Sequence, residues 1–427
     1  MSAAAPAEAP AARPLGSGSL LALGLNGIVG VGIFFVPAGV AGLVPGRAGA
    51  LAYLGAAACL VPVAVAVALL GRRFDEDGGP YVWARAAFGP RIAFAFGWLT
   101  WVSALFSTTA VVTGLATHLG PSLGFESGGA RLAFGAACVT ALALTVAAGL
   151  RPSAIVWSTV TWIKLAPLGA LLAVGAAAGA DRGAVAAPAA VELVRLPRAM
   201  LLVTFALQGF EIVPVPARHA RAGARSIPLA TLGSLGIAVA LYVGLHLVCV
   251  DHVPALAASG APLAAAAHEV GGAWLGAVVR VGTNLSALGI ALGMVAMTPR
   301  YLAALGGPQG LGEWASRERR GVPVGAVAVT AAIVIGLSFA GSLSELFALS
   351  SVAVVAQYAV TLAALAALGA RRALGLGPAH LAVAALGVAA LLLLVSAASS
   401  REALVAGGVV VVGWVARTAA RRASAGR

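Results

Sequence analysis

The chain consists largely of apolar runs that are long enough to cross a lipid bilayer. About twelve such runs, each of roughly 20 residues, follow one another between charged or proline- and glycine-containing breaks. A helix needs about 20 apolar residues to span a hydrocarbon core about 30 Å thick. The composition agrees, since 61% of the residues are hydrophobic and only 10% are charged. Together these features exclude a soluble globular enzyme, a disordered chain and a nucleic-acid-binding domain.

The fold class predicted from these runs is an all-α integral membrane protein with about twelve transmembrane helices. The connections between the runs are too short to hold a soluble domain, so residues 20–420 are expected to form one transmembrane domain between tails at 1–19 and 421–427. The expected spans are 20–44, 48–70, 92–119, 130–150, 153–179, 197–217, 228–250, 274–305, 323–340, 343–369, 378–396 and 403–419.

The arginines predict the orientation of these spans. With a cytoplasmic N-terminus, most arginines fall in the inner segments, and the outer segments hold only Arg47, Arg131, Arg182, Arg195, Arg198, Arg280 and Arg401. By the positive-inside rule both termini are cytoplasmic, and the plasma (inner) membrane is the expected location. The net charge of +13 therefore reports topology and not a nucleic-acid surface.

Two of the expected helices are interrupted by glycine at corresponding positions. The first contains Gly27, Gly30 and Gly32, and the sixth contains Gly209. Helices 1 and 6 are five apart, as expected for two inverted repeats of five helices. A broken helix frees N–H groups that suit a carboxylate and carbonyls that suit an ammonium, and a zwitterionic amino acid carries both. For the first helix alone, close packing of small residues is an equal alternative; the second break favours binding.

Several segments resemble motifs of the amino acid-polyamine-organocation (APC) superfamily of permeases. They are similar to its first-helix signature (27–38), its loop into helix 3 (79–98), its sixth helix with the following loop (209–228) and its loop between helices 8 and 9 (300–323). The motifs are weak singly but specific as an ordered set, which covers roughly residues 20–370.

The resemblance implies a leucine-transporter-like fold and amino acid transport by alternating access. In that fold five helices at about 20–179 are repeated in inverted orientation at about 197–369, helices 1 and 6 are broken, and two extra helices follow at about 378–419. The resemblance also implies which residues bind the substrate: the carboxylate near the amides of Gly30, Val31 and Gly32, and the amine near the carbonyls of Ile28, Phe205 and Leu207, beside Gly209.

Three positions bear on this transfer of the family's binding residues to the present sequence. Phe205 matches the family's aromatic gate position. Val31 stands where the family often has serine, which leaves only backbone contacts there. The segment 218–221 has arginines and a histidine where the family usually has an acidic residue, which puts the ion pairing of the inner gate in doubt.

Lys164 is the single lysine of the chain, and it lies inside the fifth apolar run. Nine residues at about 1.5 Å each from Ile155 place it about 14 Å into a core of about 30 Å. A charged lysine at that depth costs about 2.5 to 3.5 kcal/mol on insertion scales, so it is expected to face a cavity and serve function. In the family that the chain resembles, a lysine on helix 5 serves proton coupling. The alternative is a structural amine bonded to carbonyls of helix 1.

Glu211 is the single acidic residue inside an expected span and away from the ends of the spans. It is a second candidate proton carrier or a gate acceptor, and a protonated structural glutamate is an equal alternative. Cys59, Cys138 and Cys249 lie in separate apolar runs without a metal-like spacing, so no metal or cofactor is expected.

The predicted function is secondary active uptake of a neutral amino acid coupled to a proton. Amino acid exchange, or transport of an amine or another organic cation, stays open. A membrane-embedded enzyme would need clustered catalytic side chains at membrane depth, whereas Lys164 and Glu211 lie on different helices. A channel or a transporter-like sensor is the third class. The partners expected are the amino acid, the proton and the bilayer; the oligomeric state is left open.

Overall fold

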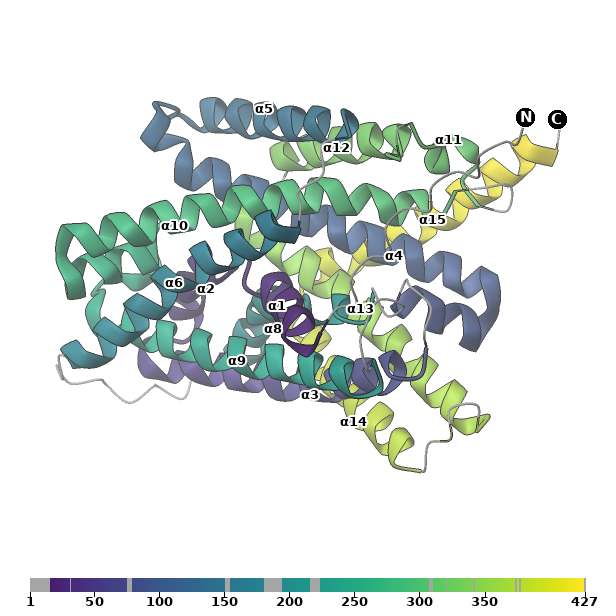
Figure 1. Ribbon diagram of the computed structural model, residues 1–427, viewed down its shortest axis with the longest axis horizontal. Helices are drawn as coiled ribbons and strands as arrows, with labels where there is room; N and C mark the ends of the chain where they lie inside the picture. Colours follow the sequence, from purple (N-terminus) through teal and green to yellow (C-terminus); the bar gives the residue numbers. More distant parts are fainter. Residues whose placement is uncertain are drawn as a thin grey trace, which may run out of the picture.

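The computed structural model describes residues 16–30, 32–74, 79–149, 154–179, 194–215, 223–306, 310–319, 321–340, 342–372, 375 and 378–425. All regular elements in this part are helical, as predicted (Figure 1). The α-helices are α1 (Ser17–Ile28), α2 (Gly32–Leu43), α3 (Ala50–Gly71), α4 (Pro80–Leu119), α5 (Gly128–Ala147), α6 (Ala154–Ala178), α8 (Leu196–Leu207), α9 (Gly223–His252), α10 (Pro262–Ala303), α11 (Glu313–Ser316), α12 (Val324–Ala340), α13 (Leu343–Ala370), α14 (Ala379–Ser396) and α15 (Ser400–Ala425). Short 3-10 turns are η1 (Gly46–Gly49), η2 (Pro121–Leu123), η3 (Phe210–Ile212) and η5 (Leu256–Ala258).

The described helices have the length and composition of membrane spans. Eight of them are long and apolar enough to cross a bilayer, and a ninth span results if the bent pair α1 and α2 is counted as one. α12 and the segment Ile163–Ala178 of α6 are apolar but shorter. An integral membrane protein is therefore supported, and the count of twelve spans stays a prediction.

The helices at both ends extend beyond the predicted span boundaries. α1 already begins at Ser17, and α15 continues to Ala425, inside the expected C-terminal tail. Arg422 lies in the last turn of α15, where a positive charge is favourable next to the free carbonyls of a helix end.

Two long helices bend sharply at a glycine. Gly89 in α4 has φ 78°, and Gly272 in α10 has φ 71°, a backbone region in which glycine carries no steric penalty. Each bend separates a short helix from a long one that crosses the molecule. Both short helices lie between expected spans, the first between 48–70 and 92–119 and the second between 228–250 and 274–305.

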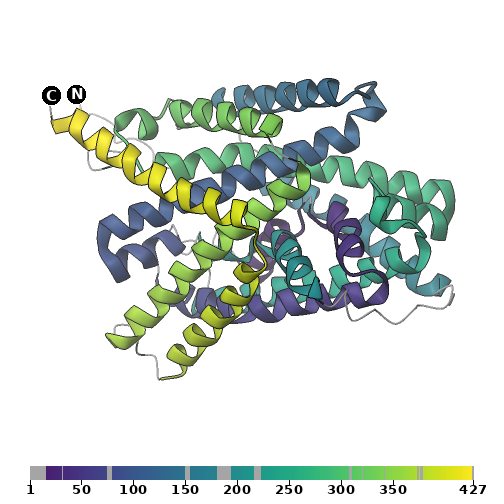
Figure 2. The ribbon, with the colours of Figure 1, turned by 180° about the vertical axis from the view of Figure 1, so that it is seen from behind.

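The long helices pack side by side into one bundle. α4 packs against α10 and α13, α10 packs against α6, and α3 packs against α9. α5 and α12 lie together along one edge of the bundle (Figure 1). Seen from behind, α15 crosses over α4 and α13 on the outside (Figure 2). The half-helices α1, α2 and α8 lie within this frame, so their ends meet in the interior.

Candidate functional site

The first helix is interrupted between Ile28 and Gly32. Val29 has ψ 80°, a backbone angle that ends the α-helix. The Gly30 amide donates to the Ile28 carbonyl at 2.7 Å. The bend between α1 and α2 is 48°. Val31, a predicted site residue, lies outside the described part. The interruption leaves carbonyls at the end of α1 without their helical partners four residues ahead.

Two side chains from other helices occupy these freed carbonyls. The Lys164 ammonium on α6 donates to the carbonyls of Asn26 at 3.0 Å and Val29 at 2.6 Å. The Tyr242 hydroxyl on α9 donates to the carbonyl of Ile28 at 2.9 Å. Lys164 is 1% exposed and Tyr242 is fully buried. The break is therefore stabilised by an ammonium and a phenol, both aimed at backbone oxygens.

The sixth helix is interrupted at the predicted glycine. α8 ends at Leu207, Gln208 is extended with ψ 156°, and Gly209 has φ 119°. The Gly209 amide does not close a helical bond to Phe205; it donates to the Glu211 carboxylate at 2.8 Å. The Phe205 carbonyl thereby loses its helical donor and becomes available to another partner.

Glu211 joins this break to α13. The same carboxylate oxygen that accepts from the Gly209 amide also accepts from the Tyr358 hydroxyl at 2.9 Å. The Tyr358 ring stacks on Phe210 with centroids 5.5 Å apart. Glu211 thus lies at the junction of the broken helix and a continuous one.

The two breaks touch through their backbones. A Cβ atom on Gly209 would overlap the Gly27 carbonyl group, and one on Gly27 would lie 2.7 Å from the Gly209 oxygen. A Cβ on Gly32 would lie 2.9 Å from the Cα atom of Ala206. Only glycine permits approaches this close, so the glycines that predicted the breaks also bring them together.

Gly30 differs from these glycines because space lies in front of it. The nearest atoms to an added Cβ are the Ile28 oxygen at 3.7 Å and the Ile290 Cδ1 on α10 at 4.0 Å. The space in front of Gly30 is therefore bordered by Ile290 of α10.

The remaining predicted site residues line α8 on the approach to its break. Leu207 is fully buried, and the Phe205 ring stacks on Phe347 of α13 with centroids 4.2 Å apart. The structure brings Ile28, Gly30, Gly32, Phe205, Leu207 and Gly209 together around the two breaks, with Lys164 behind the first break and Glu211 at the second. Segment 218–221 lies outside the described part. No group of three His, Cys, Asp or Glu side chains in the described residues has metal-binding geometry.

Three residues that contribute to the site were not predicted from the sequence. Tyr242 and Tyr358 were not singled out, although a phenol inside an apolar helix needs a hydrogen-bond partner. Gln208 was given no role, although it directly precedes Gly209, which was predicted as a site residue. Its side-chain nitrogen donates to Ser107 on α4 at 3.0 Å and to Ser350 on α13 at 3.2 Å.

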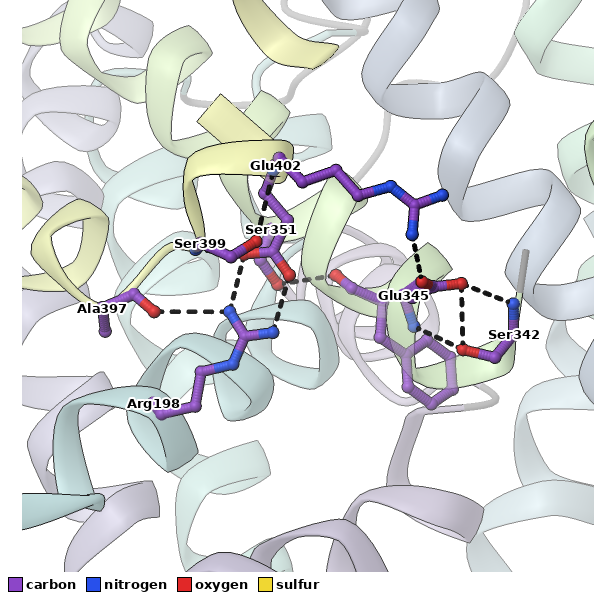
Figure 3. A network of polar contacts seen from close by, with 9 residues as sticks. Arg198, Ser342, Glu345, Ser351, Ala397, Ser399 and Glu402 are labelled. Carbon is purple, nitrogen blue, oxygen red and sulfur yellow. Dashed lines mark hydrogen bonds and ion pairs between the residues drawn. The ribbon is translucent and has the colours of Figure 1, made fainter. Parts of the chain in front are cut away.

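Away from the breaks, charged side chains link α8 to α15 and α15 to α13 (Figure 3). Arg198 forms two 2.6 Å hydrogen bonds with the carboxylate of Glu402 on α15. Arg401 bonds to Glu345 at the start of α13 at 2.8 Å. Each glutamate also accepts from the backbone amide of a serine that caps its own helix, Ser399 or Ser342. A cavity of about 250 Å³, lined by residues of α2, α8 and α13 including Arg198, lies beside this network.

Arg198→Ala is expected to lower the thermal stability of the protein. The Glu402 side chain is 7% exposed, so removal of the Arg198 guanidinium leaves a desolvated carboxylate without its partner. We expect a loss of about 1–2 kcal/mol, less than for a fully buried pair because the Arg198 side chain is 35% exposed. The unfolding temperature in detergent measures this loss of stability. Arg401→Ala is the matched control, since that pair is 76% and 43% exposed and should change the unfolding temperature little. Equal shifts in the two variants would contradict this account.

Comparison with known proteins gives one family match along nearly the whole chain. A family model described as amino acid permease matches residues 15–414. An uncharacterized transporter of Mycobacterium tuberculosis is 28% identical over 84% of this chain and 80% of its own length.

Two further relatives carry substrate names. The branched-chain amino acid permease of Lactococcus lactis subsp. cremoris is 27% identical over 75% of this chain and 74% of its own length. The human cationic amino acid transporter 4 is 28% identical over 69% of this chain and 49% of its own length. The substrate names differ among these relatives, whereas transport is common to them.

Proposed function

The chain belongs to the amino acid permease family of the APC superfamily, and from this membership we propose that it takes up a neutral amino acid together with a proton by alternating access. The observation that carries the proposal is the pair of touching helix breaks with freed backbone groups and a buried lysine. A family of permeases is one of transporters and not of enzymes.

Paired irregularities support a repeat of five helices. If α1 with α2, α3, α4, α5 and α6 are helices 1 to 5, then α8, α9, α10, α12 and α13 are helices 6 to 10. The breaks fall in helices 1 and 6, and the bends at Gly89 and Gly272 fall at the start of helices 3 and 8. Both pairs of irregularities are thus separated by five helices.

Packing supports the same pairing. α2 packs on α8, α3 on α9, α4 on α10 and α5 on α12, so four of the five equivalent pairs pack against each other. The contact of α6 with α10 has its counterpart in that of α13 with α4, and the contact of α1 with α9 has its counterpart in that of α8 with α3. α14 and α15 then follow as extra helices, which gives twelve spans in all.

Contacts between charged side chains support the proposed alternation of the spans, because they indicate which segments lie on the same side of the membrane. Arg47 bonds to Asp251, Arg198 to Glu402 and Arg401 to Glu345. Each pair joins two residues that the positive-inside rule places on the outer side. Cytoplasmic termini in the plasma membrane agree with this arrangement.

We place the substrate at the junction of the two breaks. Its carboxylate would accept from the amides of Gly30, Val31 and Gly32, and the Gly30 amide would leave the Ile28 carbonyl to do so. Its amine would donate to the carbonyls of Phe205 and Leu207 beside Gly209. The Ile28 carbonyl already accepts from Tyr242 and Gly30, so it would receive the amine by exchanging one of these donors.

We propose a neutral substrate because of the acidic side chains available at the site. Glu211 is the acidic side chain at the breaks, and one of its oxygens is held by Gly209 and Tyr358. A cationic side chain would need a carboxylate of its own. The name of the human relative keeps a cationic amino acid as the second candidate, with Glu211 as the group that would accept it.

Proton coupling is assigned to Lys164 and Glu211. A protonated lysine can donate to both α1 carbonyls at once, whereas a neutral amine is a weaker donor, so its proton strengthens the link between α6 and the end of α1. Glu211 links the second break to α13 in a way that also depends on its protonation. Protons at these two positions would therefore bias the relative positions of the broken and continuous helices.

Transport into proteoliposomes tests the proposal. Labelled amino acids are presented singly, with and without an inward proton gradient, and counterflow is measured without a gradient. Saturable uptake, counterflow and gradient-driven accumulation are expected. Non-saturable flux would indicate a channel, covalent change of the solute would indicate an enzyme, and counterflow without accumulation would indicate exchange.

Gly30→Leu is expected to abolish amino acid binding with little change in stability, because its side chain enters the space in front of the first break. Gly30→Ala should weaken binding by roughly tenfold, about 1.4 kcal/mol. Gly236→Leu is the control, since nothing lies within 4 Å of an added Cβ there. Ligand-dependent thermal shifts report the affinity. Normal affinity in Gly30→Leu would place the site elsewhere.

A further inference from the structure

Gln208 joins three helices at the second break. Its side-chain nitrogen lies 3.0 Å from the Ser107 hydroxyl and 3.2 Å from the Ser350 hydroxyl, and the two hydroxyls lie 2.7 Å apart. We call these three side chains the amide cluster. It links the end of α8 to α4 and α13.

Counting hydrogens fixes the orientation of the amide. Three short contacts need three hydrogens, and two serine hydroxyls supply only two. At least one hydrogen must therefore come from Gln208, so the NH₂ group faces the serines and can supply two. The reverse orientation would leave one contact without a hydrogen. Hydrogen bonding, and not the shape of the amide, thus decides which atom is turned away.

The Gln208 oxygen that is turned away is buried and has no hydrogen-bond partner among the described residues. A buried acceptor without a donor is unfavourable, and such atoms in native proteins are usually satisfied by water or by a ligand. Gln208 is the last residue before Gly209, so the residue that carries this acceptor lies at the second break, beside the proposed substrate site.

The surroundings of the amide cluster separate it from the groups assigned to the substrate's backbone. Those groups belong to the ends of α1, α2 and α8, whereas Ser107 and Ser350 belong to the continuous helices α4 and α13. Phe347, which stacks on Phe205, lies one turn before Ser350 on α13. The aromatic pair and the amide cluster therefore lie next to each other, between the end of α8 and α13.

We propose that Gln208 is a specificity-determining residue whose amide oxygen accepts a hydrogen bond from the side chain of the transported amino acid. This rests on the proposed function and refines it. The favoured substrates are neutral amino acids with a side-chain O–H or N–H donor. An alkyl side chain of the same shape leaves the oxygen unpaired and binds more weakly.

Isosteric pairs of amino acids test this assignment. Threonine and valine have nearly the same shape. Serine differs from alanine by one added oxygen atom. In the unaltered protein we expect threonine to bind about tenfold or more tightly than valine, the factor given by one hydrogen bond to a buried acceptor. Competition against a labelled substrate and thermal shifts in detergent measure the ratio. A threonine-to-valine ratio near one would overturn the inference.

Gln208→Met removes the oxygen while keeping the length of the side chain. We expect the threonine-to-valine ratio to fall toward one, mainly through weaker threonine binding. Gln357→Met makes the same chemical change on another helix, α13, and should preserve the ratio. Gln208→Asn, which keeps an amide, replaces the methionine variant if that protein does not fold; the shorter side chain withdraws the oxygen, so the ratio should fall there as well.

The outcomes separate the alternatives. Equal losses for threonine and valine in Gln208→Met assign the oxygen to the ammonium that both share, and overturn the side-chain assignment. Unchanged affinities for both threonine and valine assign the oxygen to bound water and overturn it as well. If no amino acid is transported or stabilises the protein, the proposed function fails; if amino acids are transported without preference between isosteres, only this inference fails.

Discussion

Lys164→Ala is expected to abolish accumulation of amino acid driven by a pH gradient while leaving substrate binding measurable. The substitution removes the ammonium that donates to the Asn26 and Val29 carbonyls, but leaves the backbone groups at Gly30 and Gly32 in place. For one proton per substrate, a gradient of about one pH unit can drive roughly tenfold accumulation. In the variant, the internal-to-external ratio should fall to about one.

Lys164→Arg and Lys164→Met separate the charge of the lysine from its proton exchange. Arginine keeps a cation near the α1 carbonyls but does not release its proton, so coupling is lost although the charge remains. Methionine keeps much of the apolar stem and removes both charge and hydrogen bonds. Uptake with and without the gradient, together with counterflow, measures each variant. Accumulation in Lys164→Ala equal to that of the unaltered protein would reject the coupling role.

The positions of the breaks were predictable because glycine is a local signal. Gly30, Gly32 and Gly209 interrupt apolar runs that otherwise read as continuous helices, and the structure ends α1 and α8 next to them. The single lysine was predictable for a similar reason, since an ammonium at membrane depth stands out against an apolar sequence. Features of this kind need no knowledge of which helices are neighbours.

The partners at the site were not predictable in the same way. Tyr242 reaches Ile28, Tyr358 reaches Glu211 and Gln208 reaches Ser107, each across more than a hundred residues of sequence. Such pairs depend on the packing of apolar helices whose surfaces are chemically alike. The bend at Gly272 was missed because a glycine in an apolar or neutral stretch also fits a loop or a packing contact.

Gly209→Ala is expected to cause the largest loss of stability among single substitutions at the site. Gly209 has φ 119°, where an alanine is strained, and its new Cβ would overlap the carbonyl group of Gly27. Strain in this backbone region costs roughly 1–2 kcal/mol, and an overlap with rigid backbone adds about 1–3 kcal/mol. Since the overlap separates the two breaks, transport and ligand-dependent stabilisation should both be lost.

Three other glycines separate the causes. In Gly89→Ala the backbone is strained, with φ 78°, but nothing lies within 4 Å of the new Cβ, so only the strain remains. In Gly27→Ala the Cβ meets the Gly209 oxygen at 2.7 Å without a positive φ, so only the contact remains. Gly169→Ala in α6 has neither and should stabilise its helix slightly. Unfolding temperatures in detergent should therefore be lowest for Gly209→Ala and highest for Gly169→Ala. Loss of transport in Gly27→Ala but not in Gly89→Ala would show that contact between the breaks, and not backbone strain, holds the substrate site together; the reverse result would contradict this.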